Sequence, residues 1–244
     1  MDIKRLMLAG FLLIVVLLGI NFWPPSAPPE AVPDFAAYAR VAEKKQAFFD
    51  FVRPSIQIEN SLILAERQAL LAIKASDAIE ARYADFEVEQ IRQLAEKYRV
   101  PNREALSDNE VLTNLLSRVD VVPEGLALAQ AANESAWGTS RFARDYRNFF
   151  GLWCFTEGCG VKPRQASAAS THQVAAFDSV RAGVAYYLLT LNSHPAYAAL
   201  RARRQDLRVA GQAVTGDALA AGLLRYSERG QDYVDEIKQM IRGN

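Results

Sequence analysis

The sequence predicts an α+β protein that is predominantly helical, with a small β insertion in its middle. Apolar residues recur at helical spacing through most of the chain, whereas residues 139–178 are rich in Gly, Ser, Thr and aromatic side chains and alternate over short stretches. A hydrophobic content of 50% over 244 residues excludes a disordered protein. The 28 basic and 28 acidic residues cancel and no Gly-rich phosphate loop is present, so we expect no nucleic-acid partner.

The first 23 residues are typical of a membrane anchor. Lys4 and Arg5 precede an uncharged apolar run over residues 6–23, and about 20 such residues span a bilayer as a helix. A cleaved signal peptide is the alternative, but no small-x-small cleavage site directly follows the run. The positive-inside rule then predicts a single-pass protein of the inner (cytoplasmic) membrane, with its folded part in the periplasm or outside the cytoplasm.

A stiff linker and a helical region are expected next. Residues 24–33 contain five of the 10 prolines, which predicts an extended spacer with no binding role. Residues 34–120 follow as the helical region, and its first helix is expected to end at Pro54. The helices are expected over residues 34–54, 58–73 and 86–98, and after a capping box formed by Ser107 and Glu110.

Another series of helices is expected on both sides of the β insertion. Pro123 is well suited to be the first residue of a helix that continues through Ala132. Residues 139–178 are expected to form loops and a small hairpin lobe. After them, helices are expected to begin near Ser179, Pro195, Asp217 and Asp232.

Glu134 is the clearest candidate for chemistry, because it comes at the end of a helix of small apolar residues and lies next to Trp137 and Gly138 in the sequence. An apolar setting and the negative end of the helix dipole both raise the pKa of a carboxyl group. A carboxylic acid that stays protonated near neutral pH is what a general acid for a glycosidic oxygen requires. The alternatives are a surface glutamate near a helix end and a tryptophan that belongs to the core.

Several motifs occur in series around Glu134. Ala-Gln-Ala at 129–131 precedes Glu-Ser-Ala-Trp-Gly-Thr-Ser at 134–140, and Asn-Phe-Phe-Gly follows at 148–151. This series resembles the signature of glycoside hydrolase family 73, the bacterial peptidoglycan N-acetylglucosaminidases. The stretch from Trp153 to Gly160 also resembles the Bax-like branch of that family. The resemblance covers roughly residues 121–242.

The resemblance implies a lysozyme-like catalytic domain over residues 121–244, with an α-lobe, a small β-lobe and an intervening cleft. It also implies that peptidoglycan glycan strands are cut at the β-1,4 bond between N-acetylglucosamine and N-acetylmuramic acid. Glu134 matches the catalytic acid of the family. Tyr226 and Tyr233 are the best counterparts of its Tyr-Ala-Thr-Asp-Pro-x-Tyr motif, although Ala, Thr, Asp and Pro are absent and one residue is inserted. We expect Tyr226 to act in catalysis and Tyr233 to contact the substrate.

A second carboxylate is less well defined. A glycosidase pairs its acid with a carboxylate about 5–5.5 Å away if retaining, or about 6.5–9.5 Å away if inverting. Glu157 is the first candidate because Cys154 and Cys159 flank its loop, and Asp178 and Glu228 are the others. The substrate's own acetamido group could replace this residue, and Glu157 could equally be a solvated glutamate at the tip of a hairpin. The further expected substrate contacts are Trp137, Phe150, Trp153 and Asp178.

The two cysteines are expected to form a disulfide, since compartments outside the cytoplasm are oxidising. Neither His172 nor His194 lies at ligand spacing from them, so no metal and no other cofactor is expected. The arginine cluster at 201–204 is expected on a solvated helix face, with contacts to peptidoglycan carboxylates as the alternative.

Two other functions compete with hydrolysis. A lytic transglycosylase shares the expected fold and needs only one glutamate, but the usual Gly-Leu-Met-Gln-type motif is missing after Glu134. A non-catalytic peptidoglycan-binding or scaffold protein is the other alternative, and the joint presence of Glu134, Trp137 and Tyr226 argues against it. The expected partners are peptidoglycan and, through the N-terminal helix, the inner membrane.

Overall fold

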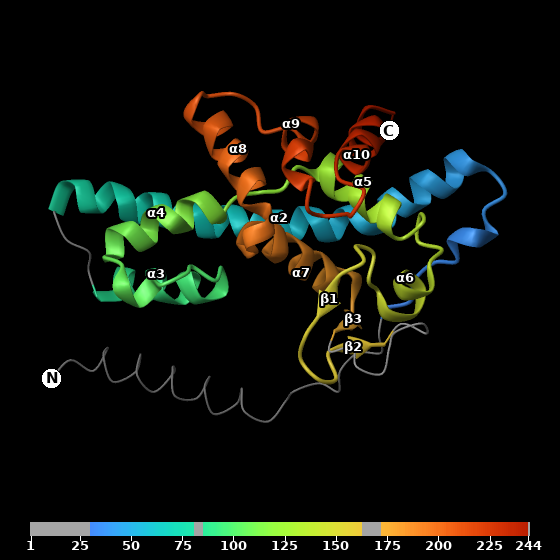
Figure 1. Cartoon of the computed structure of the whole chain (residues 1–244), viewed down its shortest axis with the longest axis horizontal. Helices are drawn as coiled ribbons and strands as arrows, with labels where there is room; N and C mark the ends of the chain where they lie inside the picture. Colours follow the sequence, from blue (N-terminus) through green and yellow to red (C-terminus); the bar gives the residue numbers. More distant parts are fainter. Residues whose placement is uncertain (1–29, 81–84, 163–171, 244) are drawn as a thin grey trace, which may run out of the picture. The chain divides into compact units, whose positions relative to one another are not determined.

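The computed structural model describes residues 30–80, 85–162 and 172–243 of the chain (Figure 1). It confirms a predominantly helical α+β protein with one small sheet, and Val32–Asn244 form one compact unit. None of the helices in the three described ranges is both long enough and apolar enough to cross a bilayer. The expected anchor at residues 1–23 and most of the linker at 24–33 lie outside these ranges.

The secondary structure follows the expected order. The longer helices are α2 (Val41–Glu80), α3 (Asp85–Lys97), α4 (Asp108–Arg118), α5 (Glu124–Glu134), α7 (Val180–Ser193), α8 (Ala198–Val209) and α10 (Gln231–Gly243). The shorter ones are α6 (Arg141–Tyr146), α9 (Gly216–Ala220) and the 3-10 turns η1 (Phe35–Ala37), η2 (Arg103–Ala105), η3 (Pro195–Tyr197) and η4 (Ala221–Leu223). The strands are β1 (Trp153–Cys154), β2 (Gly160–Val161) and β3 (Gln173–Ala175). The capping box at Ser107 and Glu110 is confirmed at the start of α4, whereas Pro123 caps α5 and is not its first residue.

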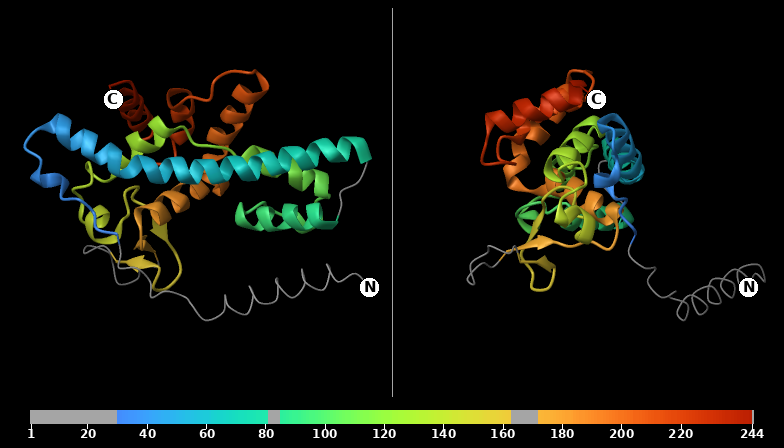
Figure 2. Two further views of the ribbon diagram at one scale, coloured as in Figure 1. Left: turned by 180° about the vertical axis from the view of Figure 1, so that it is seen from behind. Right: turned by 90° about the vertical axis from the view of Figure 1, so that its right-hand side faces the viewer.

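The predicted helix end at Pro54 is wrong, because α2 continues through this proline as one long helix (Figure 2) and packs against α5 and α7. An internal proline costs about 3 kcal/mol in a lost hydrogen bond and a steric clash. Here its ring is exposed, while Val52 and Ile56 on either side are fully buried. Burial of the inner face of α2 therefore offsets the local cost. The predicted start near Asp34 is also wrong, since Asp34 caps the short turn η1 before α2 begins.

α5 lies in the core and carries the Glu134 motif. All its residues from Leu126 to Ala132 are buried, and the helix contacts α2, α9 and α10. Small side chains on most of this surface let the neighbouring helices approach closely. α5 is consequently held from several sides, and its last residue, Glu134, has a fixed position.

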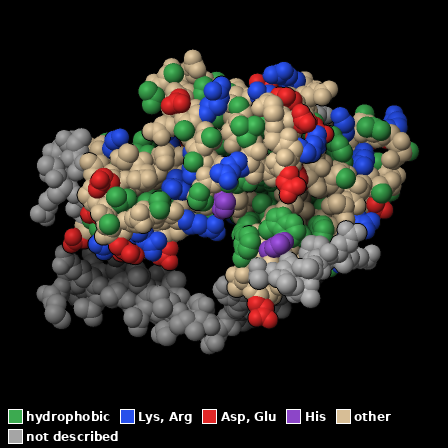
Figure 3. Space-filling model, in the orientation of Figure 1, with side chains coloured by type: hydrophobic (Ala, Val, Ile, Leu, Met, Phe, Trp, Pro, Cys, Tyr) green, Lys and Arg blue, Asp and Glu red, His purple; other side chains and the backbone are tan. Residues whose placement is uncertain are grey.

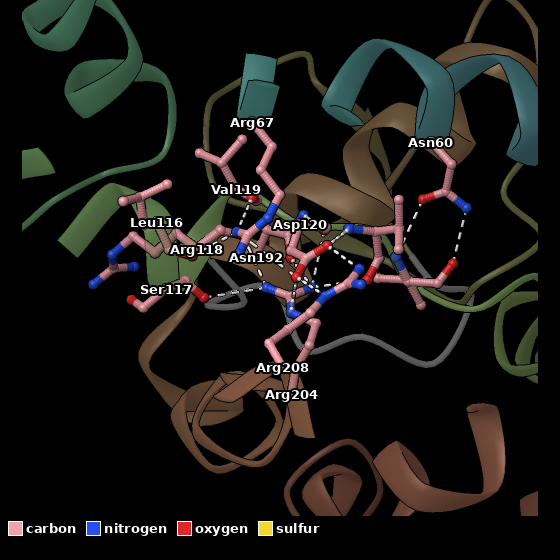
Figure 4. Close-up of polar contacts among 12 residues, drawn as sticks. Asn60, Arg67, Leu116, Ser117, Arg118, Val119, Asp120, Asn192, Arg204 and Arg208 are labelled. Carbon is pink, nitrogen blue, oxygen red and sulfur yellow. Dashed lines mark hydrogen bonds and ion pairs between the residues drawn. The ribbon is translucent and has the colours of Figure 1, made fainter. Parts of the chain in front are cut away.

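The segment that leads into α5 is held by a buried network centred on Asp120 (Figure 4). The Asp120 carboxylate accepts two hydrogen bonds from Arg208, at 3.0 and 2.9 Å, and forms longer ion pairs with Arg67 and Arg204. Arg204 is 1% exposed and donates to the carbonyls of Asp120 and Val121. The network connects α2 and α8 to the chain just before α5.

The prediction that the arginines of residues 201–204 lie on a solvated helix face is therefore wrong for two of them. Arg201 and Arg204 are both buried. Arg201 donates to the carbonyls of Leu191 and His194, just as Arg204 donates to those before α5. Each guanidinium offers five donors in a planar fork, which suits it to satisfying several carbonyls at once.

The small sheet has the order β1-β3-β2, with both outer strands antiparallel to β3. The expected hairpin is formed by β2 and β3, which are consecutive and antiparallel, and β1 pairs with the other side of β3 but not with β2. Trp153 lies opposite Val174, and Gly160 lies opposite Ala175. A Cβ on Gly160 would come within 2.0 Å of the Val174 carbonyl oxygen, so only glycine allows β2 to approach β3.

Candidate active site

The turn after α5 fixes where Glu134 sits. Ala136, Trp137 and Gly138 all have positive φ, at 50°, 58° and 75°, so the chain reverses sharply directly after the helix. The Ser135 hydroxyl closes this turn by donating to the Ala131 carbonyl at 2.6 Å and accepting from the Gly138 amide at 2.8 Å. A Cβ on Gly138 would lie 2.3 Å from the Phe35 ring. The serine and the glycine of the Glu-Ser-x-Trp-Gly motif thus have structural roles in placing the glutamate.

The Asn-Phe-Phe-Gly segment forms the wall opposite the Glu134 carboxyl. Gly151 has a φ of 63°, and a Cβ there would lie 3.6 Å from Glu134 Oε2. The buried Asn148 amide donates to the carbonyls of Leu152 and Ala175, each at 2.9 Å, and accepts from the Leu152 amide. Asn148 therefore ties the Gly151 turn to β3 and holds it against the carboxyl.

Buried tyrosines form the remaining side. The Tyr187 hydroxyl donates to Gln130 Oε1 at 2.6 Å, and Gln130 Nε2 donates to the Tyr233 hydroxyl at 2.9 Å. Because Tyr233 accepts from Gln130, its own proton is available for the Glu134 carboxylate, whose charged form the Tyr233 hydroxyl stabilises. Tyr226 donates to the Phe150 carbonyl at 2.9 Å and stacks on Tyr233.

The electrostatics of Glu134 favour its protonated form. Burial raises the pKa of the carboxyl, and the negative charge of Glu236 raises it further. Hydrogen bonds from Tyr233 and Asn133 and the charge of Arg229 lower the pKa, but the net shift is upward. Burial, together with the charge of Glu134, raises the pKa of Tyr197 to about 12, so this tyrosine stays neutral. The arrangement provides a proton donor in a largely apolar setting.

The structure brings together four of the expected site residues: Glu134, Phe150, Tyr226 and Tyr233. Phe150 is buried and stacks on Tyr187 at a centroid distance of 4.0 Å, so the part of it nearest Tyr226 is its carbonyl oxygen.

The other expected aromatic contacts, Trp137 and Trp153, have different neighbours. Trp137 packs against Phe48 and Phe49 of α2. Trp153 on β1 is 42% exposed and lies edge-on to His172. Hydrophobic side chains are visible on the surface where β1 and β3 lie, among charged groups of both signs (Figure 3).

The expected second carboxylates are all exposed. Glu157 lies in the turn between β1 and β2, Asp178 follows β3, and Glu228 precedes α10. Among the described residues, the acidic side chain whose charge acts on Glu134 is Glu236 of α10. It forms an ion pair with Arg229 at 2.7 Å.

The expected disulfide is present. Cys154 and Cys159 are bonded, with their Cα atoms 6.1 Å apart, and they close the loop between β1 and β2. Within the described ranges no group of three or more His, Cys, Asp or Glu side chains is arranged to hold a metal ion.

Sequence reasoning missed Tyr187, Tyr197 and Glu236 near the carboxyl, and it gave no separate role to Gln130 and Gly151, which lie in the quoted motifs. A usable signal existed for Gln130, which lies four residues before Glu134 and therefore on the same helix face. Glu236 carried a similar signal, because it lies three residues after Tyr233 and therefore on the same face of α10. Tyr187 and Tyr197 belong to no motif near Glu134, and only the packing of α7 and η3 brings them there.

Comparison with known proteins shows the family to which the chain belongs. A family model described as glucosaminidase, mannosyl-glycoprotein endo-beta-N-acetylglucosaminidase, matches residues 110–244. Protein bax of Escherichia coli (strain K12) is 33% identical over 222 residues, which cover 90% of this chain and 76% of that relative. No solved structure matches the chain. The chain therefore belongs to the glucosaminidase family, glycoside hydrolase family 73. Within this family it is similar to the Bax-like branch, as the sequence resemblance indicated.

Proposed function

We propose that this protein is an endo-β-N-acetylglucosaminidase that hydrolyses peptidoglycan, with Glu134 as the general acid. The bond cut is the β-1,4 bond between N-acetylglucosamine and N-acetylmuramic acid, and the domain that carries the site is lysozyme-like. The observation that supports this best is the half-buried Glu134 carboxyl, whose pKa is raised by burial between Gly151 and Tyr233. Membership of the glucosaminidase family supports the substrate class.

In the proposed mechanism the Glu134 proton passes to the glycosidic oxygen as the bond from that oxygen to the anomeric carbon breaks. No candidate carboxylate identified from the sequence is buried beside Glu134. The acetamido oxygen of the N-acetylglucosamine therefore attacks the anomeric carbon and forms a cyclic intermediate. Water then opens this intermediate and returns a proton to the Glu134 carboxylate. The outcome is retention of configuration.

The proposed mechanism makes Tyr233 the residue that orients the Glu134 carboxyl, because its hydroxyl proton is directed there. Tyr226 acts indirectly, since its hydroxyl holds the Phe150 carbonyl next to Gly151. Trp153 is the exposed aromatic side chain of β1 and offers an apolar face to a sugar ring.

The test is digestion of purified peptidoglycan by the full-length chain in detergent, with mass spectrometry of the new chain ends. We expect new reducing N-acetylglucosamine ends with the parent and none with Glu134→Gln. The matched variant Glu157→Gln should retain activity, because Glu157 is exposed in its turn. Anhydromuramic ends would instead establish a lytic transglycosylase. Absence of any new ends, with the chain sedimenting with the cell wall, would establish a non-catalytic binding protein.

We also propose that residues 1–23 anchor the protein in the inner membrane and that the folded part acts in the periplasm. The apolar run after Lys4 and Arg5 supports this, as does the disulfide between Cys154 and Cys159. Membrane fractionation of the full chain and of a chain beginning at residue 30 tests it. Recovery of both in the same soluble fraction would contradict the anchor.

A further inference from the structure

A pocket of about 530 Å³ lies beside the end of α5, between α2 and the last turns of α10. We call it the α5–α10 pocket, and its lining includes Lys45, Asn133, Trp137, Glu236, Gln239 and Met240. Its volume is within the range of ligand-binding pockets in proteins. None of its residues was singled out from the sequence except Trp137.

The α5–α10 pocket is directly connected to the Glu134 site. Asn133 lines the pocket and its amide also donates to Glu134 Oε1 at 3.4 Å. Glu236 lines the pocket and its charge acts on the same carboxyl. The pocket and the Glu134 carboxyl therefore share Asn133 and Glu236 as a common boundary.

Trp137 gives the pocket a fixed apolar wall. Its backbone and that of Ala136 have positive φ, an unfavourable conformation for residues other than glycine. The indole is held against Phe48 and Phe49, at centroid distances of 5.6 and 5.4 Å. Lys45 Nζ lies 4.9 Å from the centre of the same ring. Non-glycine residues in such conformations cluster at functional sites.

The remaining lining groups indicate what the pocket binds. Lys45 and Glu236 supply opposite charges, Asn133 and Gln239 supply amides, and Met240 adds an apolar surface. A plain glycan of N-acetylated sugars carries neither a carboxylate nor an amino group outside its muramic acid substituent. A short peptide with free carboxylates, an amino group and small apolar side chains matches all of these groups.

We propose that the α5–α10 pocket binds the peptide stem carried by N-acetylmuramic acid, so that the enzyme selects peptide-bearing glycan over denuded glycan. This inference rests on the proposed function. Lys45 receives a stem carboxylate and Glu236 the stem amino group, while Asn133 and Gln239 bond the peptide backbone. The existing ion pair of Glu236 with Arg229 is exposed and is readily exchanged, since such pairs contribute little.

The experiment compares the full-length chain on glycan strands that carry peptides and on the same strands after an amidase has removed them. The variants are Lys45→Ala and Gln239→Ala, with Lys44→Ala as the matched control, because Lys44 is adjacent on α2 but does not line the pocket. On peptide-bearing strands we expect Lys45→Ala to lower kcat/KM about tenfold through KM, the loss of one hydrogen bond to a charged group. On denuded strands all variants should match the parent, which itself should cleave them less well.

Equal cleavage of both substrates by the parent would overturn the inference. So would a Lys45→Ala variant that loses activity equally on both, because Lys45 would then act only by supporting Trp137. If the parent cleaves neither substrate, the proposed function fails, and the inference is decided by binding instead. Sedimentation of the Glu134→Gln chain with peptide-bearing strands should then exceed that with denuded strands and should weaken in the double variant with Lys45→Ala.

Discussion

Two opposing influences act on the Glu134 carboxyl. Burial raises its pKa, whereas the hydroxyl proton of Tyr233 stabilises the charged form and lowers it. The Tyr233 proton points to Glu134 because Gln130 donates to the Tyr233 oxygen and is itself fixed by Tyr187. The balance leaves an acid that is protonated at higher pH than an ordinary glutamate but is still able to ionise once its proton has been given away.

Removal of this hydroxyl should change the pH profile in a defined direction. In Tyr233→Phe the charged form of Glu134 loses a hydrogen bond, so the pKa of Glu134 rises. Because the protonated acid is the active form, the alkaline limb of kcat/KM should move to higher pH. Tyr226→Phe is the control, since that hydroxyl donates to the Phe150 carbonyl and not to Glu134. A limb that stays in place or moves to lower pH in Tyr233→Phe would contradict this role.

Single residues near the acid were predictable where a motif marked them. Glu134, Phe150, Tyr226 and Tyr233 were named from the sequence, and the structure brings them together. Trp137 was expected to contact the substrate as part of the motif, yet its packing on α2 depends on Phe48 and Phe49, about 90 residues earlier. Tyr187 reaches the site only through the packing of α7. Contacts of this kind depend on the assembled core, which local patterns do not contain.

Among the helices and strands, several helix starts were predictable, including those of the short η3 and α9, whereas the length of α2 and the pairing of the strands were not. α4 began at its capping box, and α5 ended at Glu134 as expected. α2 continues past Pro54, the strongest local signal for a helix end. The burial of apolar side chains on both sides of the proline outweighs the free-energy cost of a proline inside a helix. The strands have two or three residues each, and β3 pairs with partners up to about 20 residues away, which no alternation pattern could reveal.

The disulfide between β1 and β2 should contribute modestly to stability. The closed loop is short, with a sequence separation of 5, and the chain-entropy relation gives about 2 kcal/mol for a loop of this size. In the Cys154→Ser, Cys159→Ser double variant the free energy of unfolding, measured with denaturant, should fall by about this amount. Reductant should lower the unfolding free energy of the parent to the value of the variant and should leave the unfolding free energy of the variant unchanged. A variant as stable as the oxidised parent would contradict the estimate.

Across the whole molecule, the Asp120 network joins parts of the chain that are far apart in sequence. It connects Arg67 of α2 and Arg204 and Arg208 of α8 to the segment before α5 (Figure 4). Burial alone would raise the pKa of Asp120. The hydrogen bond from Arg208 and the charges of Arg204, Arg67 and Arg208 together lower it below its ordinary value.

Neutralising Asp120 should be costly, because it leaves buried guanidinium groups without their counter-charge. We expect Asp120→Asn to lower the free energy of unfolding by about 3–5 kcal/mol at neutral pH, the range for breaking a buried ion pair. The control is Asp217→Asn, whose exposed ion pair with Arg242 should be worth less than about 1 kcal/mol. Similar losses in the two variants would contradict the role given to the network.

The same network predicts how stability depends on pH. Since the folded-state pKa of Asp120 is depressed, its contribution is fully present above the unfolded value of about 3.9. It is lost as the pH falls through the folded-state pKa. The difference in unfolding free energy between parent and Asp120→Asn should therefore shrink in acid, as measured by denaturant unfolding at a series of pH values. A difference in unfolding free energy that stays constant from neutral to acid pH would contradict this role of the Asp120 charge.

The most direct test of Glu134 as the general acid is the titration of its carboxyl group. Carbon-13 labelling of glutamate side chains would let NMR follow each carboxyl with pH, and the Glu134→Gln variant would identify the signal that disappears. We predict a signal that titrates above the ordinary glutamate value of about 4.3 and coincides with the alkaline limb of kcat/KM on peptidoglycan. A carboxyl that titrates at or below that value, or an alkaline limb that persists in Glu134→Gln, would contradict Glu134 as the general acid.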